Sequence, residues 1–474
     1  MNQINKRPRI GYSQVIFVLC LTTLMSSIDT SIVNIGLRTI EEALNANFSS
    51  VQWVILSYML AVTSLIVGIG RIGDIFGKKK LFIFGIALFT VASLLCGISA
   101  SIYELIVFRA FQGIGAATLI ALSFAIVGDL VPKEKIASGM AALTATMPMG
   151  FALGPSIGGL LISAFGWQSI FFLNIPLGAI AFIMVLRFPS IPISEKAQKF
   201  DIWGMLILAA TLMAYVLSVT LAENLGIRGI VIGLIAAAIV GLVVFIIVEK
   251  KMKAPLINLK MFKDAIFSGS LVISVILYTT TNGFNTIFPF FLEQAKDLSA
   301  STAGLLMMAG PLGCAAFTPV ASFMAKRFGN AKTMILGILI LGIGIFIMST
   351  FGVLTSTIII AIIVFLWNGG LAFFQAPNNA FIMSLAKPEQ RGVISGLLNL
   401  ARTIGQTTGI AVLGALFYLF TRTKSIVTAS PKDIVVGIHS TFLVTVLIMI
   451  CAFLLGMIVY KPWKKEKTLL NDER

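Results

Sequence analysis

The feature that most constrains this chain is a series of fourteen apolar runs. Each is long enough, as a helix, to cross the roughly 30 Å of hydrocarbon in a bilayer. The runs centre near residues 24, 60, 90, 115, 151, 177, 211, 238, 278, 312, 341, 369, 407 and 448. Backbone amides in lipid must find partners within the protein, and runs of this length satisfy them as helices. The sequence therefore predicts an all-α polytopic membrane protein with 14 transmembrane helices.

The distribution of charge predicts how the chain is threaded. A net charge of +16 could indicate a nucleic-acid ligand, but the basic residues form short clusters between apolar runs rather than one continuous face. With the N-terminus in the cytoplasm, 27 of the 35 Lys and Arg residues fall in cytoplasmic segments and 6 in external ones, as the positive-inside rule requires. We expect a multi-pass protein of the cytoplasmic (inner) cell membrane with both termini inside and no nucleic-acid partner.

Two long hydrophilic segments divide the spans into groups. Arg187 to Asp201 and Glu249 to Asp264 flank the seventh and eighth runs. We predict an N-terminal six-helix bundle (residues 1–190), a linker with two inserted helices (191–264), and a C-terminal six-helix bundle with a cytoplasmic tail (265–474). The loop after the second span is similar in sequence to the loop after the tenth, and Gly329 in the second loop corresponds to Gly77 in the first. Parallel halves of this kind indicate a transporter that arose by duplication.

The sequence does not support a metal site, a catalytic nucleophile or a dinucleotide-binding site. The four cysteines lie in separate apolar runs without metal-ligand spacing, and no nucleophile stands beside a base. Gly68-x-Gly70-x2-Gly73 fits a dinucleotide-binding pattern, but it ends a membrane helix and follows no strand. We expect no enzyme activity, no catalytic or metal site and no cofactor. A membrane enzyme or a channel stays the alternative class.

The loop between the second and third spans predicts a cytoplasmic gate. It reads Gly70-x3-Asp74-x2-Gly77-Lys78. A carboxylate at Asp74 can accept bonds from the free amides at the start of a neighbouring helix, and Lys78 can pair with Asp129 at the end of the fourth span. The alternative is that the lysines only set topology.

Two arginines lie within spans. A guanidinium in mid-membrane costs at least about 2.5 kcal/mol and must face protein or water. Arg109 shares a helix face with Gln112, and the pair could line a proton path or clamp helix carbonyls. Arg402, in the thirteenth span, has the same two interpretations, and we expect it to correspond to Arg109 in the second half.

Asp29 is the clearest acid well inside the hydrocarbon layer. An ionised carboxylate there is expensive, so a proton, a cationic substrate or a basic side chain should neutralise it. Competition between a proton and a cation for Asp29 would couple their movements. The alternative is permanent pairing with Arg109 or Arg402 that only holds helices together. Further candidates for the proton and substrate site are amides within spans, which need a partner or a wet cavity: Asn34, Asn285 and Asn378.

The fifth span carries a face without side chains. Gly150, Gly154 and Gly158 recur every four residues and therefore line one side of a helix. Pro155 removes an amide donor and predicts a bend, and Gly159 completes the motif Gly150-x3-Gly154-Pro155-x2-Gly158-Gly159. The alternative is an ordinary packing seam of small residues.

These motifs together resemble those of a known family. The loop at Gly70 and the Arg109-x2-Gln112-Gly113 stretch are similar to signatures of the major facilitator superfamily, and the fifth-span motif resembles that of its proton-coupled exporters. The stretch from Asp29 to Asn34 resembles the first-helix motif of the fourteen-span drug:proton antiporters. Two positions depart from that motif, because Gly36 and Arg38 replace an alanine and a proline.

The resemblance covers the whole chain and implies a fold and a function. The expected fold is the major facilitator fold, with two six-helix bundles plus a two-helix insert. The expected function is export of a lipophilic, cationic drug or antibiotic in exchange for protons, by alternating access and as a monomer in the bilayer. The alternative is proton-coupled transport of a specific metabolite or lipid-like compound.

Overall fold

The computed structural model describes residues 11–46, 48–189, 201–225, 228–252, 255–387, 390–421 and 429–460. Every regular element in these ranges is a helix, and 14 helical segments are long and apolar enough to cross a membrane. The predicted all-α class and the predicted number of spans are therefore confirmed. Asn34 and Pro155 lie on described helices, but their side chains lie outside the described part of the chain.

The chain forms two compact units. The first, unit 1, contains residues 1–209, 251–256 and 383–397, and the second, unit 2, contains the rest. The helices of unit 1 are α1 (Tyr12–Ala43), α2 (Phe48–Phe76), α3 (Lys78–Gly97), α4 (Ile102–Leu130), α5 (Lys133–Phe165), the short α6 (Ser169–Phe172) and α7 (Asn174–Leu186). It also takes in the first turns of α8 (Ile202–Leu225) and of α14 (Arg391–Thr421). The predicted bundle boundaries stay a prediction.

Unit 2 holds the remainder of α8 and α14 together with the other helices. These are α9 (Gly229–Lys251), the 3-10 turn η1 (Leu259–Lys263), α10 (Ala265–Phe290), the π-helical turn η2 (Phe291–Ala295), α11 (Ala300–Phe328), α12 (Asn330–Met348), α13 (Thr357–Leu385) and α15 (Pro431–Tyr460). The six spans of the second half therefore run from α10 to α15, as α1 to α7 make the six of the first half.

Local chemistry fixes where several helices begin. Ser101 Oγ accepts a bond of 3.3 Å from the Glu104 amide, and Glu104 Oε2 accepts one of 2.9 Å from the Ala100 amide at the start of α4. Asp264 Oδ1 accepts from the Ile266 amide at 2.8 Å at the start of α10. These side chains satisfy amides that have no partner within the helix.

The turns between α2 and α3 and between α11 and α12 share one backbone geometry. Gly77 has φ of 102° and Gly329 has φ of 92°, a region that only glycine enters without strain. In each case the next helix begins at the following residue. A glycine at this place in both turns allows one helix to follow another with no loop between them. This geometry is a physical reason for the sequence similarity between the two turns.

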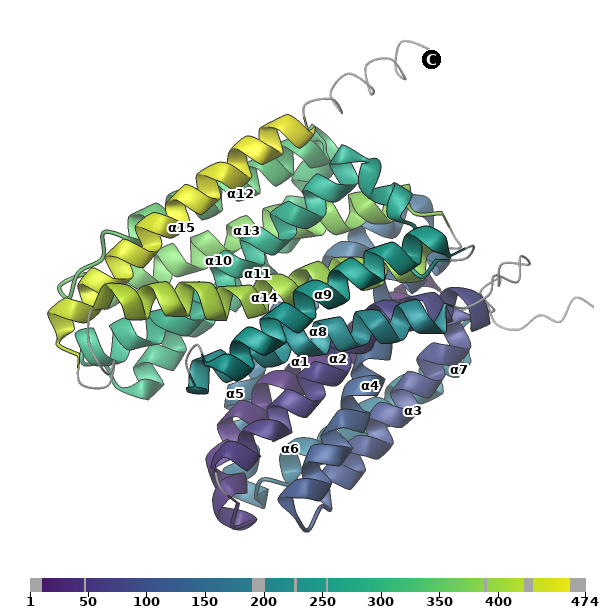
Figure 1. Ribbon diagram of the computed structural model, residues 1–474, viewed down its shortest axis with the longest axis horizontal. Helices are drawn as coiled ribbons and strands as arrows, with labels where there is room; N and C mark the ends of the chain where they lie inside the picture. Colours follow the sequence, from purple (N-terminus) through teal and green to yellow (C-terminus); the bar gives the residue numbers. More distant parts are fainter. Residues whose placement is uncertain are drawn as a thin grey trace, which may run out of the picture. The chain divides into compact units, whose positions relative to one another are not determined.

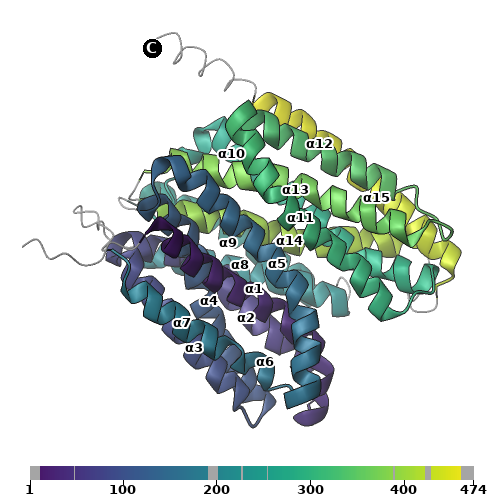
Figure 2. The ribbon, with the colours of Figure 1, turned by 180° about the vertical axis from the view of Figure 1, so that it is seen from behind.

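Within unit 1, α4 has the most buried membrane-spanning segment. Helices α2 and α3 both pack on α4, and α1 packs on α5, α7 and α4 (Figures 1 and 2). Polar groups on the inner faces of α1 and α4 therefore meet protein rather than lipid.

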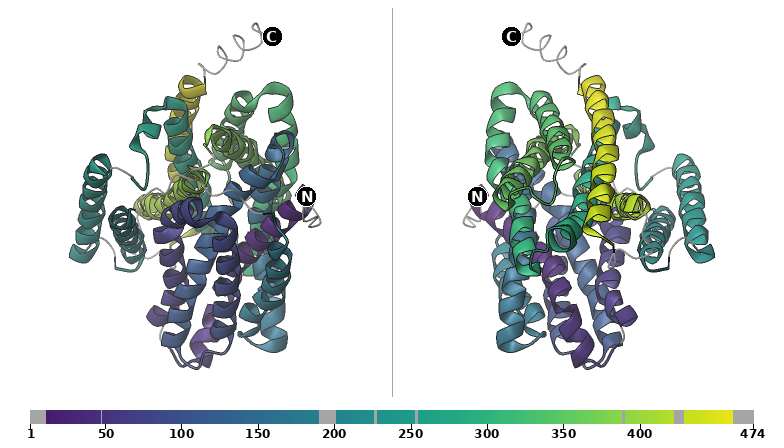
Figure 3. Two further views of the ribbon diagram at one scale, coloured as in Figure 1. Left: turned by 90° about the vertical axis from the view of Figure 1, so that its right-hand side faces the viewer. Right: turned by 90° about the vertical axis from the view of Figure 1, so that its left-hand side faces the viewer.

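Within unit 2, α15 packs on α10 and α12, and α11 packs on α12. The inserted helix α9 contacts α8 where Gly241 meets Thr211. Helix α8 reaches α14 through a hydrogen bond of 2.5 Å between Tyr215 Oη and Thr408 Oγ1. Helices α8 and α9 lie beside one another (Figure 3), and only three residues of α9 are buried. Most of α9 therefore has a surface suited to lipid.

Candidate functional site

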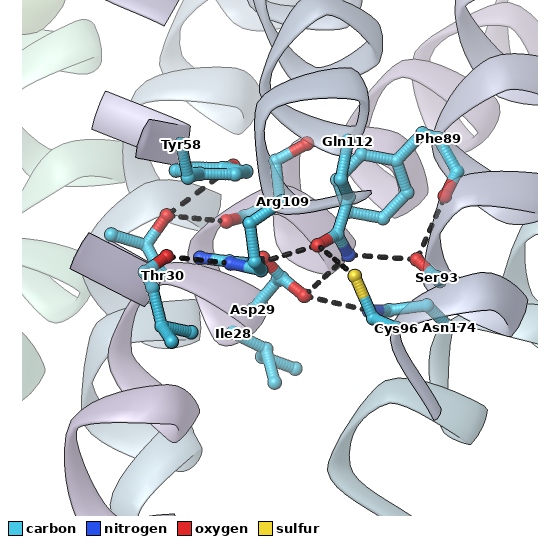
Figure 4. Close-up of polar contacts among 12 residues, drawn as sticks. Ile28, Asp29, Thr30, Tyr58, Phe89, Ser93, Cys96, Arg109, Gln112 and Asn174 are labelled. Atoms are coloured by element: carbon cyan, nitrogen blue, oxygen red, sulfur yellow. Dashed lines mark hydrogen bonds and ion pairs between the residues drawn. The ribbon is translucent and has the colours of Figure 1, made fainter. Parts of the chain in front are cut away.

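The Asp29 carboxylate is the centre of a buried polar cluster. Asp29 lies in the middle of α1 and is 0% exposed. Its Oδ2 atom is 2.6 Å from Arg109 Nη1, an ion pair between α1 and α4 (Figure 4). Its Oδ1 atom accepts bonds of 2.8 Å from both Gln112 Nε2 and Asn174 Nδ2. Both carboxylate oxygens are thus occupied by protein donors.

Arg109 is held from several sides. Its Nε donates to the Val54 carbonyl of α2 at 3.1 Å, and its Nη1 also donates to Gln112 Oε1 at 2.6 Å. The guanidinium lies 4.2 Å from the centre of the Tyr58 ring, within the range of a cation–π interaction (Figure 4). The structure therefore brings the predicted residues Asp29, Arg109 and Gln112 together.

Gln112 joins the ion pair to α3. Its Nε2 donates to Ser93 Oγ at 2.7 Å, and Ser93 Oγ donates to the Phe89 carbonyl at 2.7 Å (Figure 4). The cluster pairs the Asp29 carboxylate with the Arg109 guanidinium. The Gln112 side-chain amide bonds to both of them and also to Ser93. Such a carboxylate can take up a proton, but the guanidinium beside it then loses its counter-charge.

The glycine face of α5 lies against α1, next to this cluster. Ser31 Oγ lies 3.3 Å from the Gly150 carbonyl oxygen, and that carbonyl shares the single hydroxyl proton with the Ile28 carbonyl at 3.1 Å and the Ser27 carbonyl at 3.2 Å. A Cβ at Gly150 would lie 2.5 Å from Ser27 Cβ, and a Cβ at Gly154 would overlap Ser31 Oγ. A Cβ at Gly158 would lie 2.5 Å from Ile32 Cγ1, whereas one at Gly159 would meet no atom within 4 Å. Three of the four predicted glycines are thus required for the close approach of the two helices.

Unit 2 contains a similar seam between α10 and α14. Thr279 Oγ1 donates to the Gly405 carbonyl at 3.1 Å. A Cβ at Gly405 would lie 2.5 Å from the Val275 carbonyl oxygen, and one at Gly409 would overlap the Thr279 carbonyl oxygen. The seam joins the first and the fifth spans of the second half, as α1 and α5 are joined in the first half.

The place of Arg402 corrects one expectation. Arg402 lies on α14, the fifth span of the second half, whereas Arg109 lies on the fourth span of the first half. The predicted correspondence between the two arginines is therefore wrong, because mid-span position alone does not identify equivalent helices. Arg402 is half-buried in unit 2, close enough to Tyr278 to interact with it electrostatically.

The turn between α2 and α3 carries a second charged cluster, which gathers Asp74, Lys78, Asp129 and Arg391. Asp74 Oδ1 accepts from the Gly392 amide at 3.0 Å and its Oδ2 from the Val393 amide at 3.2 Å, at the start of α14. Lys78 Nζ lies 3.0 Å from Asp74 Oδ1 and 2.9 Å from Asp129 Oδ2.

Two further features complete this cluster. Arg391 Nη1 lies 2.6 Å from Asp129 Oδ1 and donates to the Gly128 carbonyl at 2.6 Å. At Gly70 a Cβ would overlap the Gly392 carbonyl oxygen, so the backbone contact requires glycine. The five predicted gate residues, Gly70, Asp74, Gly77, Lys78 and Asp129, therefore lie at one place in unit 1.

The amides predicted from the second half lie in different surroundings. Asn378 is 1% exposed on α13, and its Nδ2 donates to Ser274 Oγ of α10 at 3.2 Å. Asn285 is exposed on α10, four residues before Pro289, whose ring removes a donor for the Asn285 carbonyl. The side chain of Asn34 lies outside the described residues.

Sequence reasoning missed several members of the two charged clusters: Asn174, Ser93, Tyr58 and Arg391. Asn174 opens α7 as an amide within an apolar stretch, the same signal that identified Asn34, Asn285 and Asn378 as candidates. Ser93 and Tyr58 are ordinary residues of apolar helices, and nothing in the chain around them marks their partners. Arg391, at the first turn of α14, is a basic residue at a span end and is indistinguishable from a topology signal.

Comparisons with known proteins agree with this geometry. The family described as the Major Facilitator Superfamily matches residues 19–201, 190–410 and 271–473. The chain is 30% identical to the riboflavin transporter RibZ of Clostridioides difficile (strain 630) over 408 residues, 85% of this chain and 88% of that protein. It is 29% identical to the multidrug resistance protein Stp of Mycobacterium tuberculosis (strain CDC 1551 / Oshkosh), over 83% of this chain and 73% of that protein.

Further similarities extend the same pattern. Multidrug resistance protein 3 of Bacillus subtilis (strain 168) is 28% identical over 85% of this chain and 79% of its own length. Among solved structures, the human organic anion transporter MFSD10 (TETRAN) superposes with a TM-score of 0.64 at 15% identity, covering 94% of this chain and 100% of that chain. At this identity the structural match concerns the fold.

Proposed function

The chain belongs to the major facilitator superfamily, and we propose that it is one of the drug-efflux members of that superfamily, exporting lipophilic compounds in exchange for protons by alternating access. In this proposal the protein lies in the cytoplasmic membrane, with both termini inside, and works as a monomer. The observation that carries it is the buried Asp29 carboxylate paired with Arg109 at 2.6 Å.

The proposed coupling runs through that ion pair. A proton that reaches Asp29 neutralises it and leaves the Arg109 guanidinium without its counter-charge. Breaking a buried pair from one side destabilises the surrounding structure by about 3–5 kcal/mol. A free-energy difference of that size changes the ratio of two arrangements of the helices by at least about 100-fold, because each 1.4 kcal/mol is a factor of about ten. The proton is released when the pair forms again.

The proposed gate is the cluster at the α2–α3 turn. Asp74 is bonded to two amides at the start of α14, and Asp129 is paired with both Lys78 and Arg391. We infer that these bonds form in the outward-facing state and break when the cytoplasmic side opens. The glycine face of α5 would let α1, which carries Asp29, move with α5 as one piece.

The expected competition between a proton and a cationic substrate for Asp29 stays a prediction. Three protein donors already occupy the carboxylate. A cation could reach it only after Arg109 or the two amides had moved away. The proposed proton role does not depend on that step, because a proton needs far less space.

The test of the proposed function is Asp29→Asn in proteoliposomes with an imposed pH gradient. Asparagine keeps the shape but carries no charge, so we expect gradient-driven export of a fluorescent lipophilic compound to fall by at least about 100-fold. The matched control is Asp297→Asn, because Asp297 is exposed and its φ of 56° suits asparagine. Full gradient-driven export by Asp29→Asn would remove Asp29 from the mechanism.

A second candidate function is proton-coupled transport of one specific metabolite. The 30% identity to a riboflavin transporter favours it, as do the neutral amides buried in unit 2. The same proteoliposomes distinguish the two candidates when they are loaded in turn with riboflavin and with a panel of lipophilic drugs. Transport of riboflavin alone would establish the second candidate in place of the first.

A further inference from the structure

Two neutral hydrogen bonds connect α10 and α13 inside unit 2. Asn378 Nδ2 donates to Ser274 Oγ at 3.2 Å, and Gln375 Nε2 donates to Tyr278 Oη. Ser274 and Tyr278 are four residues apart on α10, and Gln375 and Asn378 are three apart on α13. Each pair therefore shares one helix face, and the two bonds lie about one turn from each other. All four side chains are buried.

One atom in this group has no partner. Asn378 Oδ1 is buried, and no donor from the described residues reaches it. Ser274 cannot supply one, because its hydroxyl proton is used in a bond of 2.7 Å to the Ser270 carbonyl. Native proteins leave few buried acceptors unsatisfied, and within a membrane the penalty for doing so is greater. An acceptor of this kind needs a donor from outside the described residues, and a bound compound can supply one.

The buried charges of the two units restrict the chemical class of the compound that could supply this donor. Glu249, at the last turn of α9, is the only buried charged residue among the described residues of unit 2. In unit 1, the Asp29 carboxylate is already bonded to three protein donors. Among the described residues of unit 2, α10 and α13 therefore carry no buried carboxylate that could bind a cation, whereas they carry a neutral acceptor.

We propose that Asn378 Oδ1 accepts a hydrogen bond from an N–H of the transported compound, and that this N–H belongs to an amide or imide edge. Such an edge presents an N–H beside a carbonyl. It matches a side-chain amide, which offers an acceptor and, on Nδ2, a second N–H besides the one given to Ser274. Tyr278 and Gln375, one turn away, hold the α13 face in place. This inference rests on the proposed export function but concerns what is carried, not what drives it.

The test compares two probes that differ by one hydrogen-bond donor. Riboflavin carries an imide N–H, and its imide-N-methylated derivative does not. Binding to the purified full-length protein is measured by the quenching of flavin fluorescence, so the result does not depend on transport. We expect the wild-type protein to bind riboflavin at least about 10-fold more tightly than the methylated probe, which corresponds to about 1.4 kcal/mol. Equal affinities would overturn the proposal.

Variants assign that preference to Asn378. Asn378→Leu should bind both probes equally, with an affinity near that of the wild type for the methylated probe. The matched control is Asn368→Leu on the same helix, because among the described residues the Asn368 amide donates to the Val364 carbonyl one turn away, at 3.4 Å, and to no other helix. The control should keep the 10-fold preference. A preference that persists in Asn378→Leu would overturn the assignment.

A second variant covers the case in which Asn378→Leu does not fold. Asn378→Asp keeps the side-chain shape and, at a pH high enough to ionise the buried carboxyl, adds a negative charge, so at that pH it should bind a quaternary-ammonium probe at least about 10-fold more tightly than the wild type does. Unchanged selectivity in a folded Asn378→Asp protein would overturn the proposal. Asp29→Asn distinguishes this inference from the proposed function, because it should lose gradient-driven export and keep the preference for the imide N–H.

Discussion

The α1–α5 pair of unit 1 and the α10–α14 pair of unit 2 make the same backbone contact with different chemistry beside it. In each, a hydroxyl on the first span of a half lies within hydrogen-bond distance of a glycine carbonyl on the fifth, Ser31 with Gly150 at 3.3 Å and Thr279 with Gly405 at 3.1 Å. Two residues before the hydroxyl, unit 1 has Asp29 and unit 2 has Leu277, and both are fully buried.

The difference extends to the whole of each unit. The buried charged residues of unit 1 are Asp29, Arg71, Asp74, Lys78, Arg109 and Asp201, while the described part of unit 2 contains Glu249. The close helix contact occurs in both units, and the buried charged groups of the described residues are concentrated in unit 1. The glycine face by itself therefore does not identify an antiporter, because unit 2 has such a face without a buried acid beside it.

The largest effect on export is expected when a large side chain replaces a glycine in the α1–α5 contact or in the α10–α14 contact. Gly154→Leu and Gly409→Leu each place a side chain where a Cβ already overlaps an atom of the partner helix. Overpacking of this kind costs about 1–3 kcal/mol or more. We expect both variants to insert into the membrane and to lose export by at least about 100-fold, since about 3 kcal/mol corresponds to slightly more than that, measured in proteoliposomes. Gly159→Leu and Gly414→Leu are the matched controls, because neither position has an atom within 4 Å of an added Cβ.

The outcome of that experiment tests the comparison directly. Loss of export in both seam variants would mean that the two contacts serve the same purpose. Loss in Gly154→Leu alone would mean that only the seam beside Asp29 takes part in exchange. Normal export by both would show that the close approach is not needed for transport.

A smaller effect is expected at the two turns that share the glycine geometry. After Gly77 the turn carries buried ion pairs, whereas Lys326 and Arg327 before Gly329 are exposed. Asp74→Asn keeps the shape but weakens the bonds to Lys78 and to the amides of α14. We expect the population to shift toward inward-facing forms by roughly 10-fold, since bonds to charged groups contribute about 1.5–3 kcal/mol.

That shift can be measured by the labelling of single cysteines placed at the two membrane faces of the protein. The control is Arg327→Gln in the second turn, which should leave the labelling unchanged. Unaltered accessibility in Asp74→Asn would mean that the cluster at the α2–α3 turn holds helices together without acting as a gate.

The helices could be predicted from the sequence because lipid leaves the backbone few choices. Apolar runs of sufficient length determine the spans. The sequence similarity between the α2–α3 and α11–α12 turns identifies two glycines, and both have a positive φ. The mid-span charges Asp29 and Arg109 could be predicted as members of a site for the same reason, because a charge in hydrocarbon needs a partner.

The partners themselves could not be predicted in full. Ser93 and Tyr58 are common residues in membrane helices, and their roles depend on how α2, α3 and α4 pack. For Arg402 the residue itself was identified correctly and its counterpart in the first half was not. Its mid-span charge was easy to find, but it was matched to Arg109 by depth alone, and helix order places the two arginines on different spans of their halves. Sequence reveals which groups need partners, and packing decides which partners they find.

The smallest expected effect comes from the two hydroxyls that join the seams. Ser31→Ala removes a hydroxyl that the Gly150 carbonyl shares with two carbonyls of α1, Thr279→Val removes the bond to the Gly405 carbonyl, and both leave the glycine contact in place. Such bonds within membrane proteins contribute about 0.6 kcal/mol on average. Both variants should therefore lower the free energy of unfolding by similar small amounts, measured by denaturation in mixed micelles. Export should change by less than about 3-fold in Thr279→Val, because Leu277 beside it cannot titrate.

Ser31→Ala sharpens the comparison, because Ser31 lies two residues from Asp29 on α1. If the hydroxyl only joins α1 to α5, its loss should match that of Thr279 in both stability and export. If export falls by about 10-fold while stability falls by no more than in Thr279→Val, then the position of α1 against α5 affects the Asp29–Arg109 pair itself. The control is the dependence of export on the imposed pH gradient, because a change confined to packing would leave that dependence as it is in the wild type.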